Sequence, residues 1–181
     1  VDFRSSAALL VVCAFCKSTL LRKDMNLEKL GVMAELLKDS SPLQLRASGR
    51  FKGKSFDVVG RVQMDYGAGT WNEWHIAFDW ENQAWLGEAQ GNYSVSREVQ
   101  VKEKLPALES LEPGSPVTIQ GKPYEVSDIQ DARCVGAEGE IPHRIEPGFE
   151  TTVVDLSGGE GAFATIDYGD DPPRIYLGER V

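Results

Sequence analysis

Two cysteines separated by two residues are the strongest candidates for chemistry in this sequence. Cys13 and Cys16 form a C-x-x-C motif within "VVCAFCKS". Two thiolates at this spacing supply half of a tetrahedral zinc site, and structural zinc takes four ligands. The chain holds no second pair, because Cys134 lies far away in sequence. We therefore expect zinc at Cys13 and Cys16 only if a second ligand pair exists outside this chain; the alternative is two unpaired thiols in a hairpin.

A few acidic and histidine residues are candidates for acid–base chemistry. "EGEIP" carries Glu138 and Glu140, and "NEWH" carries Glu73 and His75. An enzyme or a small-ligand-binding protein would need these four side chains in one cleft, because an acid and a base must reach the same substrate. No Ser or Cys nucleophile lies at a recognisable spacing from either histidine, His75 or His143. A non-enzymatic role is therefore the first prediction, and a site made of the four residues is the alternative.

All the tryptophans fall within one short stretch, "TWNEWHIAFDWENQAWLG": Trp71, Trp74, Trp80 and Trp85. Trp74 and Trp80 alternate with Ile76 and Phe78, which predicts that both tryptophans face a core. Trp85 occupies a position that recurs later in the chain, so it is also predicted to be structural. Trp71 lies at a predicted turn, and with Asn72 and Glu73 it is the candidate for contact with a ligand or partner.

The elements that would position these residues are mostly strands. In "SFDVVGRVQM", Phe56, Val58, Val62 and Met64 are predicted to share one face of a strand. Glycines and polar residues in "DYGAG", "QGN", "SGGEG" and "GDDPP" are typical of turns between strands. The sequence therefore predicts a mainly β protein.

One helix is predicted, over residues 24–41. An apolar stripe recurs there at steps of three and four residues: Leu27, Leu30, Ala34 and Leu37. Asp24 or Asn26 would cap its start, and "SSP" at 40–42 would end it.

An internal repeat divides the rest of the chain. "GKSFDVVGRV" at 53–62 matches "GKPYEVSDIQ" at 121–130, and "FDWENQAWLGE" at 78–88 matches "IDYGDDPPRIYLGE" at 166–179. Two ordered pairs of matches indicate a duplication, with two related small β-barrel or sheet modules. The predicted organisation is a hairpin over 1–23, the helix over 24–41, a first β-module over 43–101, a linker over 102–116 and a second β-module over 117–181.

Charge and composition narrow the classes of partner. The first hundred residues are balanced, so residues 101–181 carry the whole net charge of −9. An acidic half repels phosphate backbones, which argues against nucleic acid and favours a cationic partner such as a basic protein face or a polyamine. No run of about 18 apolar residues is present. The odd number of cysteines predicts a reducing, cytoplasmic setting, and the start at Val1 suggests a piece of a longer chain.

Several of these segments together resemble a known family. "FDVVGRV", "GTWNEWHIAFD", "AWLGEAQG", "GAEGEIP" and "FATIDYG" with "YLGE" are similar to the bacterial domain of unknown function 4178 (DUF4178), over about residues 43–181. "FRSSAALLVVCAFCKSTL" resembles the second half of the zinc ribbon that precedes this domain in longer relatives, with Cys13 and Cys16 at its second knuckle.

The resemblance implies no established activity. It implies an accessory role beside polyamine-synthesising enzymes, small membrane proteins and envelope-stress proteins. Because the sequence shows no catalytic constellation beside its two aromatic-rich β-units, we predict a non-enzymatic binding or scaffolding module that acts through β-surfaces on a protein partner or by self-association. The resemblance adds a peripheral link to a membrane complex.

Overall fold

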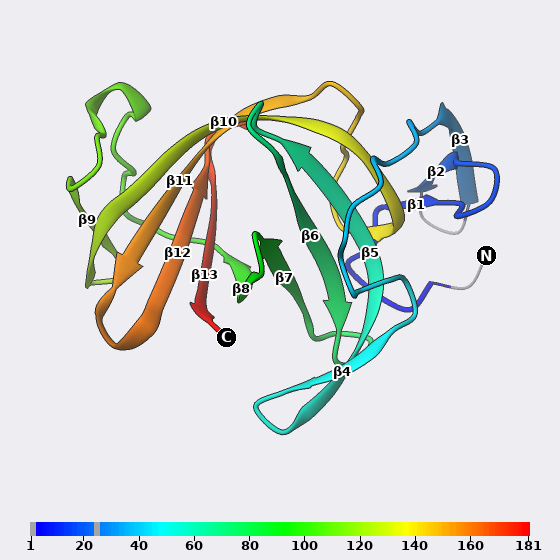
Figure 1. Ribbon diagram of the computed structural model, residues 1–181, viewed down its shortest axis with the longest axis horizontal. Helices are drawn as coiled ribbons and strands as arrows, with labels where there is room; N and C mark the ends of the chain where they lie inside the picture. Colours follow the sequence, from blue (N-terminus) through cyan, green and yellow to red (C-terminus); the bar gives the residue numbers. More distant parts are fainter. Residues whose placement is uncertain (1–2, 24–25) are drawn as a thin grey trace.

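The computed structural model describes residues 3–23 and 26–181, and almost all of its regular structure is strand (Figure 1). Two short 3₁₀ turns, η1 (Leu108–Ser110) and η2 (Gly159–Gly161), are the only helical segments in these ranges. None of the helical segments in the described ranges has the length and apolar character needed to cross a membrane. The strands are β1 (Leu10–Val12), β2 (Ser18–Lys23), β3 (Asn26–Val32), β4 (Ser48–Phe51), β5 (Lys54–Asp65), β6 (Thr70–Ala77), β7 (Gln83–Ala89), β8 (Asn92–Val99), β9 (Pro116–Ile119), β10 (Lys122–Ile141), β11 (Glu150–Gly158), β12 (Ala162–Asp167) and β13 (Arg174–Arg180).

The strands form one large antiparallel sheet, which confirms the prediction of a mainly β protein. Neighbouring strands follow the order β5–β6–β7–β8–β13–β12–β11–β10, and β10 also pairs with β5. The pairing therefore returns to its starting strand, and we call these eight strands the ring. Strands β1, β2 and β3 continue the sheet beyond β10, whereas β4 flanks β5 and β9 flanks β10.

The long strand β10 closes the ring. Its first part, up to Arg133, pairs with β11, and its second part, from Cys134 to Gly139, pairs with β5. At the closure Gly60 lies opposite Gly139. A Cβ atom on Gly60 would collide with the carbonyl oxygen of Glu140, and one on Gly139 would collide with that of Val59. Two glycines therefore permit the close approach of the two backbones.

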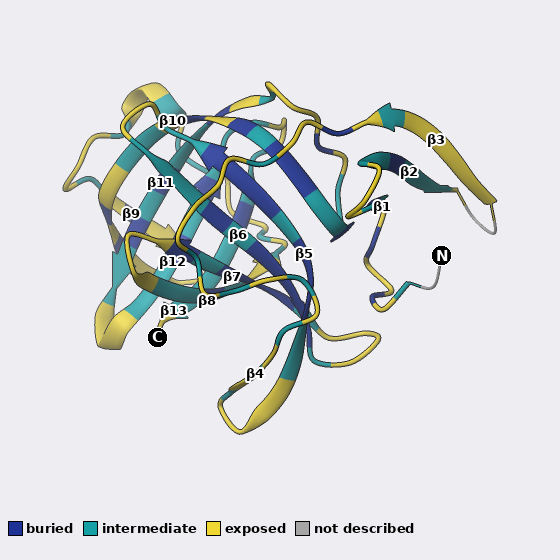
Figure 2. Ribbon diagram, turned by 45° about the vertical axis from the view of Figure 1, so that its right-hand side comes forward, coloured by how far each residue is buried: buried dark blue, intermediate teal, exposed yellow. Residues whose placement is uncertain are grey.

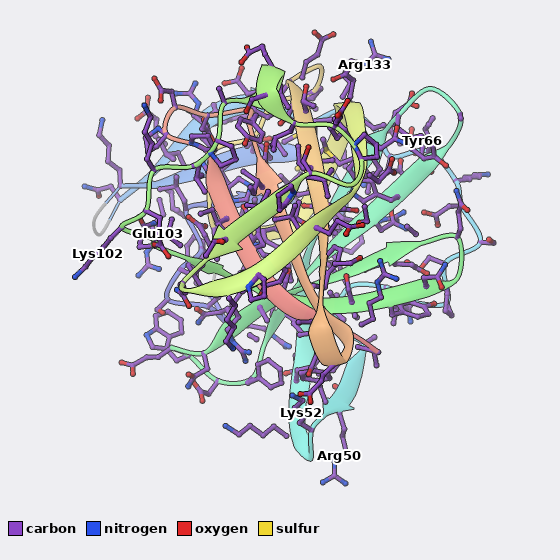
Figure 3. The ribbon with its side chains drawn as sticks, turned by 90° about the vertical axis from the view of Figure 1, so that its left-hand side faces the viewer. Arg50, Lys52, Tyr66, Lys102, Glu103 and Arg133 are labelled. Carbon is purple, nitrogen blue, oxygen red and sulfur yellow. The ribbon has the colours of Figure 1, made fainter. Side chains whose placement is uncertain are left out.

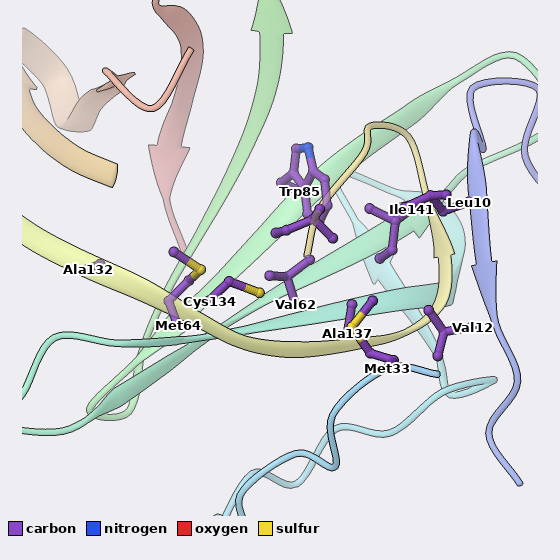
Figure 4. Close-up of a cluster of buried hydrophobic side chains, with 11 residues drawn as sticks. Leu10, Val12, Met33, Val62, Met64, Trp85, Ala132, Cys134, Ala137 and Ile141 are labelled. Atoms are coloured by element: carbon purple, nitrogen blue, oxygen red, sulfur yellow. The ribbon is translucent and has the colours of Figure 1, made fainter. Parts of the chain in front are cut away.

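Apolar side chains gather in three clusters, one inside the ring and two outside it. The inner cluster joins β5, β7 and β10 to β1 (Figure 4) and contains Leu10, Val12, Met33, Val62, Met64, Trp85, Ala132, Cys134, Ala137, Ile141 and Ile145. The outer clusters cover β5–β8 and β10–β13. The segment 36–47, which we call the strap, lies over the first of these, with Leu43, Leu45 and Ala47 packed against it.

A bulge in β5 changes the faces that simple alternation predicted. The register with β6 shifts between Val58 and Gly60. Val58 therefore belongs to the outer cluster under the strap, whereas Val62 and Met64 belong to the inner cluster. The prediction that Val58 shares a face with Val62 and Met64 was wrong, because one extra residue reverses the side-chain direction.

The strap and the inner cluster bury both faces of β6 (Figure 2). On the outer face Trp74 is fully buried, and on the inner face His75 is 1% exposed. Trp80, predicted to continue this core face, is instead 46% exposed. Strand β6 ends at Ala77, and the Asp79 carboxylate accepts a hydrogen bond from the Asn82 backbone N–H (2.9 Å), so Trp80 lies in a turn.

The predicted helix over 24–41 is wrong. Its proposed cap Asp24 lies outside the described residues, and Asn26–Val32 form strand β3, paired with β2. Leu27, Leu30 and Leu37 of the expected stripe are exposed. An isolated helix of this length is marginal without a surface to receive its apolar face. Pairing with β2 instead satisfies the backbone N–H and C=O groups of the segment.

The first pair of repeated segments occupies matching hairpins. The turns Lys52–Gly53, between β4 and β5, and Gln120–Gly121, between β9 and β10, both have positive φ at two consecutive residues. The second pair forms the β6–β7 and β12–β13 hairpins. These two hairpins occupy different places in their halves of the ring, and the duplication into two modules stays a prediction.

We predict that Gly60→Ala lowers the free energy of unfolding by about 2–3 kcal/mol, because the added methyl group forces β5 and β10 apart. Gly159→Ala is the matched control, since nothing lies within 4 Å of the Cβ position there. We expect it to change the free energy by less than about 1 kcal/mol. Urea denaturation measures both, and equal effects of the two substitutions would contradict the proposed role of the closure.

Candidate functional site

A cavity of about 470 Å³ lies inside the ring, beside the inner cluster. Residues from β6, β7, β8, β10, β11, β12 and β13 line it. Part of its rim is the exposed turn between β7 and β8, with Ala89, Gln90 and Asn92. There the Gln90 side-chain amide donates a hydrogen bond to the Tyr66 hydroxyl (2.9 Å). Small-molecule sites typically enclose about 300–1,000 Å³, so this cavity is large enough for a ligand.

The repeated sequence aromatic–Leu–Gly–Glu shapes the cavity. Trp85 and Gly87 in β7, and Tyr176 in β13, all line it. Gly178, two residues from Tyr176 in β13, permits the close approach of β8, because a Cβ atom there would lie 2.1 Å from the Val95 carbonyl oxygen. The two leucines of the motif pack into the outer clusters. Between β7 and β13 runs β8, whose inward residues Ser94 and Ser96 are small. Gly87 in β7 and the two serines in β8 leave the volume that larger side chains would fill.

Aromatic rings form one side of the cavity. Trp85 and Tyr176 stand on either side of β8, and Trp71 lies at the start of β6. The Trp71 ring is in contact with Tyr66 (centroids 5.9 Å apart), and Trp85 is packed against His75 (5.2 Å). These contacts hold the rings in place, so the cavity has a rigid aromatic surface.

Carboxylates also line the cavity. Glu73 comes from β6, Asp128 from β10, Asp155 from β11 and Asp167 from β12. In the described part of the chain none of the four takes part in an ion pair. Among the described lining residues Arg180 is the one basic side chain, and its guanidinium lies over the Phe163 ring (5.8 Å). The cavity therefore carries an excess of negative charge.

The environment of Glu73 raises its pKa to about 7. Burial is the main cause, because it disfavours the charged form, and the neighbouring carboxylates Asp167 and Asp155 add to it. One hydrogen bond, donated by the Trp71 indole N–H (3.1 Å), acts in the opposite direction. Burial also raises the pKa of Asp155, whose carboxylate accepts a hydrogen bond from Thr165 (2.8 Å). A cation in the cavity would favour the ionised form of both groups.

Both histidines are enclosed and uncharged at neutral pH. Burial lowers the pKa of His75 to about 4 and that of His143 to about 3. The His75 Nδ1–H donates a hydrogen bond to the Glu140 carbonyl oxygen (2.9 Å), since a carbonyl can only accept. Trp85 lies between the two imidazoles, 5.2 Å from His75 and 5.6 Å from His143. Both imidazoles therefore pack against Trp85, one of the aromatic residues that line the cavity.

The two carboxylates of "EGEIP" do not line the cavity. Glu140 accepts hydrogen bonds from the backbone N–H groups of Arg4 (2.7 Å) and Ser5 (2.9 Å), which fastens the N-terminal segment to β10. Glu138 borders a separate, open hollow beside the strap, where it lies 3.8 Å from Arg61 and 3.9 Å from Lys17. The predicted site of Glu73, His75, Glu138 and Glu140 is therefore distributed over different places rather than gathered in one cleft.

The predicted contact residues Trp71, Asn72 and Glu73 divide between the two faces of β6. Trp71 and Glu73 line the cavity. Asn72 is buried on the outer face, where it accepts hydrogen bonds from Arg61 and donates to Asp39 (2.8 Å) and Glu88 (3.2 Å). Its contacts fix the strap to the ring.

The glutamates of the repeated aromatic–Leu–Gly–Glu sequence, Glu88 and Glu179, bind segments outside the ring. Glu88 accepts hydrogen bonds from Ser41 of the strap (2.6 Å) and from the Trp74 indole (2.8 Å). Glu179 pairs with Lys52 (2.6 Å), and Figure 3 shows Lys52 and Arg50 on the β4–β5 hairpin that projects from the ring. The positive charge of Lys52 is therefore already paired outside the cavity.

The C-x-x-C motif forms the turn between β1 and β2. Its backbone is held by hydrogen bonds from the Cys13 N–H to Ser18 (3.0 Å) and from the Lys17 N–H to Cys13 (3.0 Å). Cys16 is exposed, and a hydrogen bond with Ser18 lowers its pKa to about 7. Within the described residues no cluster of three or more His, Cys, Asp or Glu side chains could hold a metal ion. The turn thus offers two thiols toward a zinc site and no more.

Sequence reasoning did not find Asp155, Asp167 and Tyr176, which complete the cavity. The signal was present in the repeat, because Trp85 and Tyr176 occupy the same position of the aromatic–Leu–Gly–Glu motif. Strand alternation also puts Asp155 and Asp167 opposite the buried residues Val154 and Ile166. What could not be read is that this polar face turns inward, since that depends on closure of the ring.

Comparison with known proteins gives one match. A family model described as "Domain of unknown function (DUF4178)" matches residues 44–181. The matched region begins in the strap and includes every strand of the ring. No curated protein and no solved structure matches the chain.

We predict that Glu73→Gln stabilises the protein at high pH and has little effect near pH 4.5. The pKa of Glu73 is raised, so between pH 4.5 and 7 the folded state keeps a proton that the unfolded state has released. The free energy of unfolding of the native chain therefore falls as pH rises through this window. The variant lacks this loss, and at pH 8 we expect it to be more stable by about 2 kcal/mol.

Denaturation with urea at pH 4.5, 6 and 8 measures this difference, with Glu125→Gln on the exposed face of β10 as the control. If the difference in free energy of unfolding between the native chain and Glu73→Gln does not change with pH, the raised pKa of Glu73 is contradicted.

Proposed function

The chain belongs to the DUF4178 family, and we propose that it is a non-enzymatic binding protein that holds one small organic molecule inside the ring. The observation that carries the proposal is the cavity itself. Protein interiors are close-packed, and unfilled volume lowers stability. Here Gly87, Ser94 and Ser96 keep the centre of the strand ring open, next to aromatic side chains that could hold a ligand.

The proposal includes no catalytic step. Burial lowers the pKa of His75 and of His143 far below neutrality, so neither titrates in the range that general acid–base catalysis requires. His75 is also occupied by the Glu140 carbonyl, and Cys134 is buried with its pKa raised to about 12. Glu73 has a pKa of about 7, but His75, Glu138 and Glu140 do not line the cavity beside it, and this separation supports binding over an enzyme that uses the four residues together.

We also propose that the hairpin of β1 and β2 is half of a zinc ribbon. Cys13 and Cys16 on one tight turn fit two of the four ligands of a structural zinc ion, which would add rigidity to the hairpin. The other two ligands would come from outside this chain. The described residues supply no third ligand, so zinc added to this chain alone would be held weakly.

We predict that iodoacetamide at pH 7 alkylates Cys16 at least ten times faster than Cys134. A lowered pKa gives Cys16 a large thiolate fraction, whereas Cys134 is buried and its pKa is raised. One equivalent of Zn²⁺ is expected to slow the reaction of Cys16 less than tenfold. Peptide mass spectrometry follows both thiols. Complete protection by one equivalent of Zn²⁺ would contradict the half-site, and rapid alkylation of Cys134 would contradict its burial.

For the cavity we predict that Ser96→Phe abolishes small-molecule binding. Its ring would enter the space between Trp85 and Gly178, the residues that flank Ser96 in the sheet. Ser55→Phe adds the same ring to the exposed β4–β5 hairpin and is the control. Saturation-transfer NMR with a library of neutral, anionic and cationic fragments measures binding without prior choice of a ligand.

We expect at least one fragment to bind the native chain and Ser55→Phe, with at least tenfold weaker binding to Ser96→Phe. Thermal unfolding shows whether the variants are folded. If Ser96→Phe does not fold, Ser94→Val replaces it, because the valine side chain fills less of the cavity. Absence of any bound fragment, or equal binding to the filled variant, would refute the proposed function.

A further inference from the structure

We propose that the ligand is an organic amine, with ammonium groups against the cavity carboxylates and a carbon skeleton against Trp85 and Tyr176. This inference rests on the proposed function and adds the chemical class of the ligand. It follows from three properties of the cavity: its excess of negative charge, its aromatic residues and the dispersed positions of its acids.

The first property is an excess of negative charge: Arg180 is the one basic side chain among the described lining residues, and its effect on the pKa of Asp155 is smaller than that of burial. Glu73, Asp155 and Asp167 accept hydrogen bonds only from neutral groups in the described chain: the Trp71 indole, the hydroxyls of Thr165 and Thr151, and the Gly169 backbone N–H. Neutral donors satisfy some oxygen lone pairs but leave the net charge in place. Charges in a partly enclosed site interact more strongly than in bulk water. A positively charged ligand is therefore favoured, and an anionic one is repelled.

The second property is the aromatic side of the same cavity. An ammonium group near the face of a Trp or Tyr ring gains about 0.5–2 kcal/mol from the cation–π interaction. The methylene groups of an amine can also contact the rings of Trp85 and Tyr176 and leave water. An inorganic cation gains nothing from such apolar contact. The pairing of acids with aromatic rings thus fits an organic cation.

The third property separates an amine from a metal ion. A bound Ca²⁺ or Mg²⁺ needs several oxygen ligands within about 2.6 Å of one point. The four carboxylates come from four different strands, and no group of them in the described ranges converges closely enough to hold a metal. An extended molecule with several charged groups can bind separated carboxylates at the same time.

The positions of the acids also favour more than one ammonium group. Asp128 is exposed at the rim, whereas Glu73 is enclosed between Trp71 and the inner cluster. A linear diamine can place one charge at depth and the second near the rim. Butane-1,4-diamine is the simplest probe with this form.

The test compares three probes that share a four-carbon chain and differ in charge: butane-1,4-diamine, butane-1,4-diol and butanedioate. We expect calorimetry at pH 7.5 and low ionic strength to show binding of the diamine at least tenfold tighter than that of the other two. Asp155→Asn is expected to weaken diamine binding at least tenfold. Glu112→Gln removes the same charge from an exposed loop before β9 and is expected to change it less than twofold.

Each outcome bears on one of the two claims. If the diol or the dioate binds as tightly as the diamine, the amine class is wrong and the binding function stands. The class also fails if Mg²⁺ displaces the diamine at equal concentration, if Glu112→Gln weakens binding as much as Asp155→Asn, or if fragments bind in the cavity but the diamine does not. If neither the diamine nor any fragment binds, the proposed function fails as well.

Discussion

Closure of the strand ring by β10 is the constraint on which the rest of the structure depends. One strand of twenty residues pairs first with β11 and then with β5, so the two halves of the ring share a single continuous backbone. The approach is close enough to require glycine at positions 60 and 139. Closure turns the polar faces of β6, β10, β11 and β12 toward one another. Without closure of the ring, the cavity carboxylates would face water, as acidic side chains usually do: Glu73, Asp128, Asp155 and Asp167.

The interior that results is divided into a filled part and an open part. The inner cluster fills the part near β1 and β5 with Val62, Met64 and Ile141. The open part lies where the aromatic–Leu–Gly–Glu motif occurs twice, and Trp85, Tyr176 and Gly87 of the two copies line it. The same motif places its leucines in the outer clusters, and its glutamates bind the strap through Glu88 and the projecting β4–β5 hairpin through Glu179. One four-residue pattern thus supports the outside of the ring and leaves space inside it. Enclosed carboxylates with a raised pKa lower stability at neutral pH, and such a cost is common at binding sites.

Local patterns in the sequence were sufficient for the fold class and for part of the site. Alternation and turn residues predicted a mainly β chain, and the DUF4178 resemblance over 43–181 was confirmed by the match over 44–181. Trp71 and Glu73, singled out at a predicted turn, both line the cavity. Strand β3, where a helix was predicted, could not be recognised from its own residues, because it forms by pairing with β2. The bulge after Val58 and the closure of the ring decide which faces point inward, and both depend on contacts between segments far apart in sequence.

The four tryptophan indoles give the most direct test that the ring interior receives an organic cation. Trp71 and Trp85 line the cavity, Trp74 is buried on the outer face, and Trp80 lies in an exposed turn. Their N–H signals in a nitrogen–proton NMR spectrum can be followed while butane-1,4-diamine is added. The account predicts that the signals of Trp71 and Trp85 move together and saturate, while that of Trp80 stays in place. Movement of Trp80 alone, or of none of the four, would contradict it.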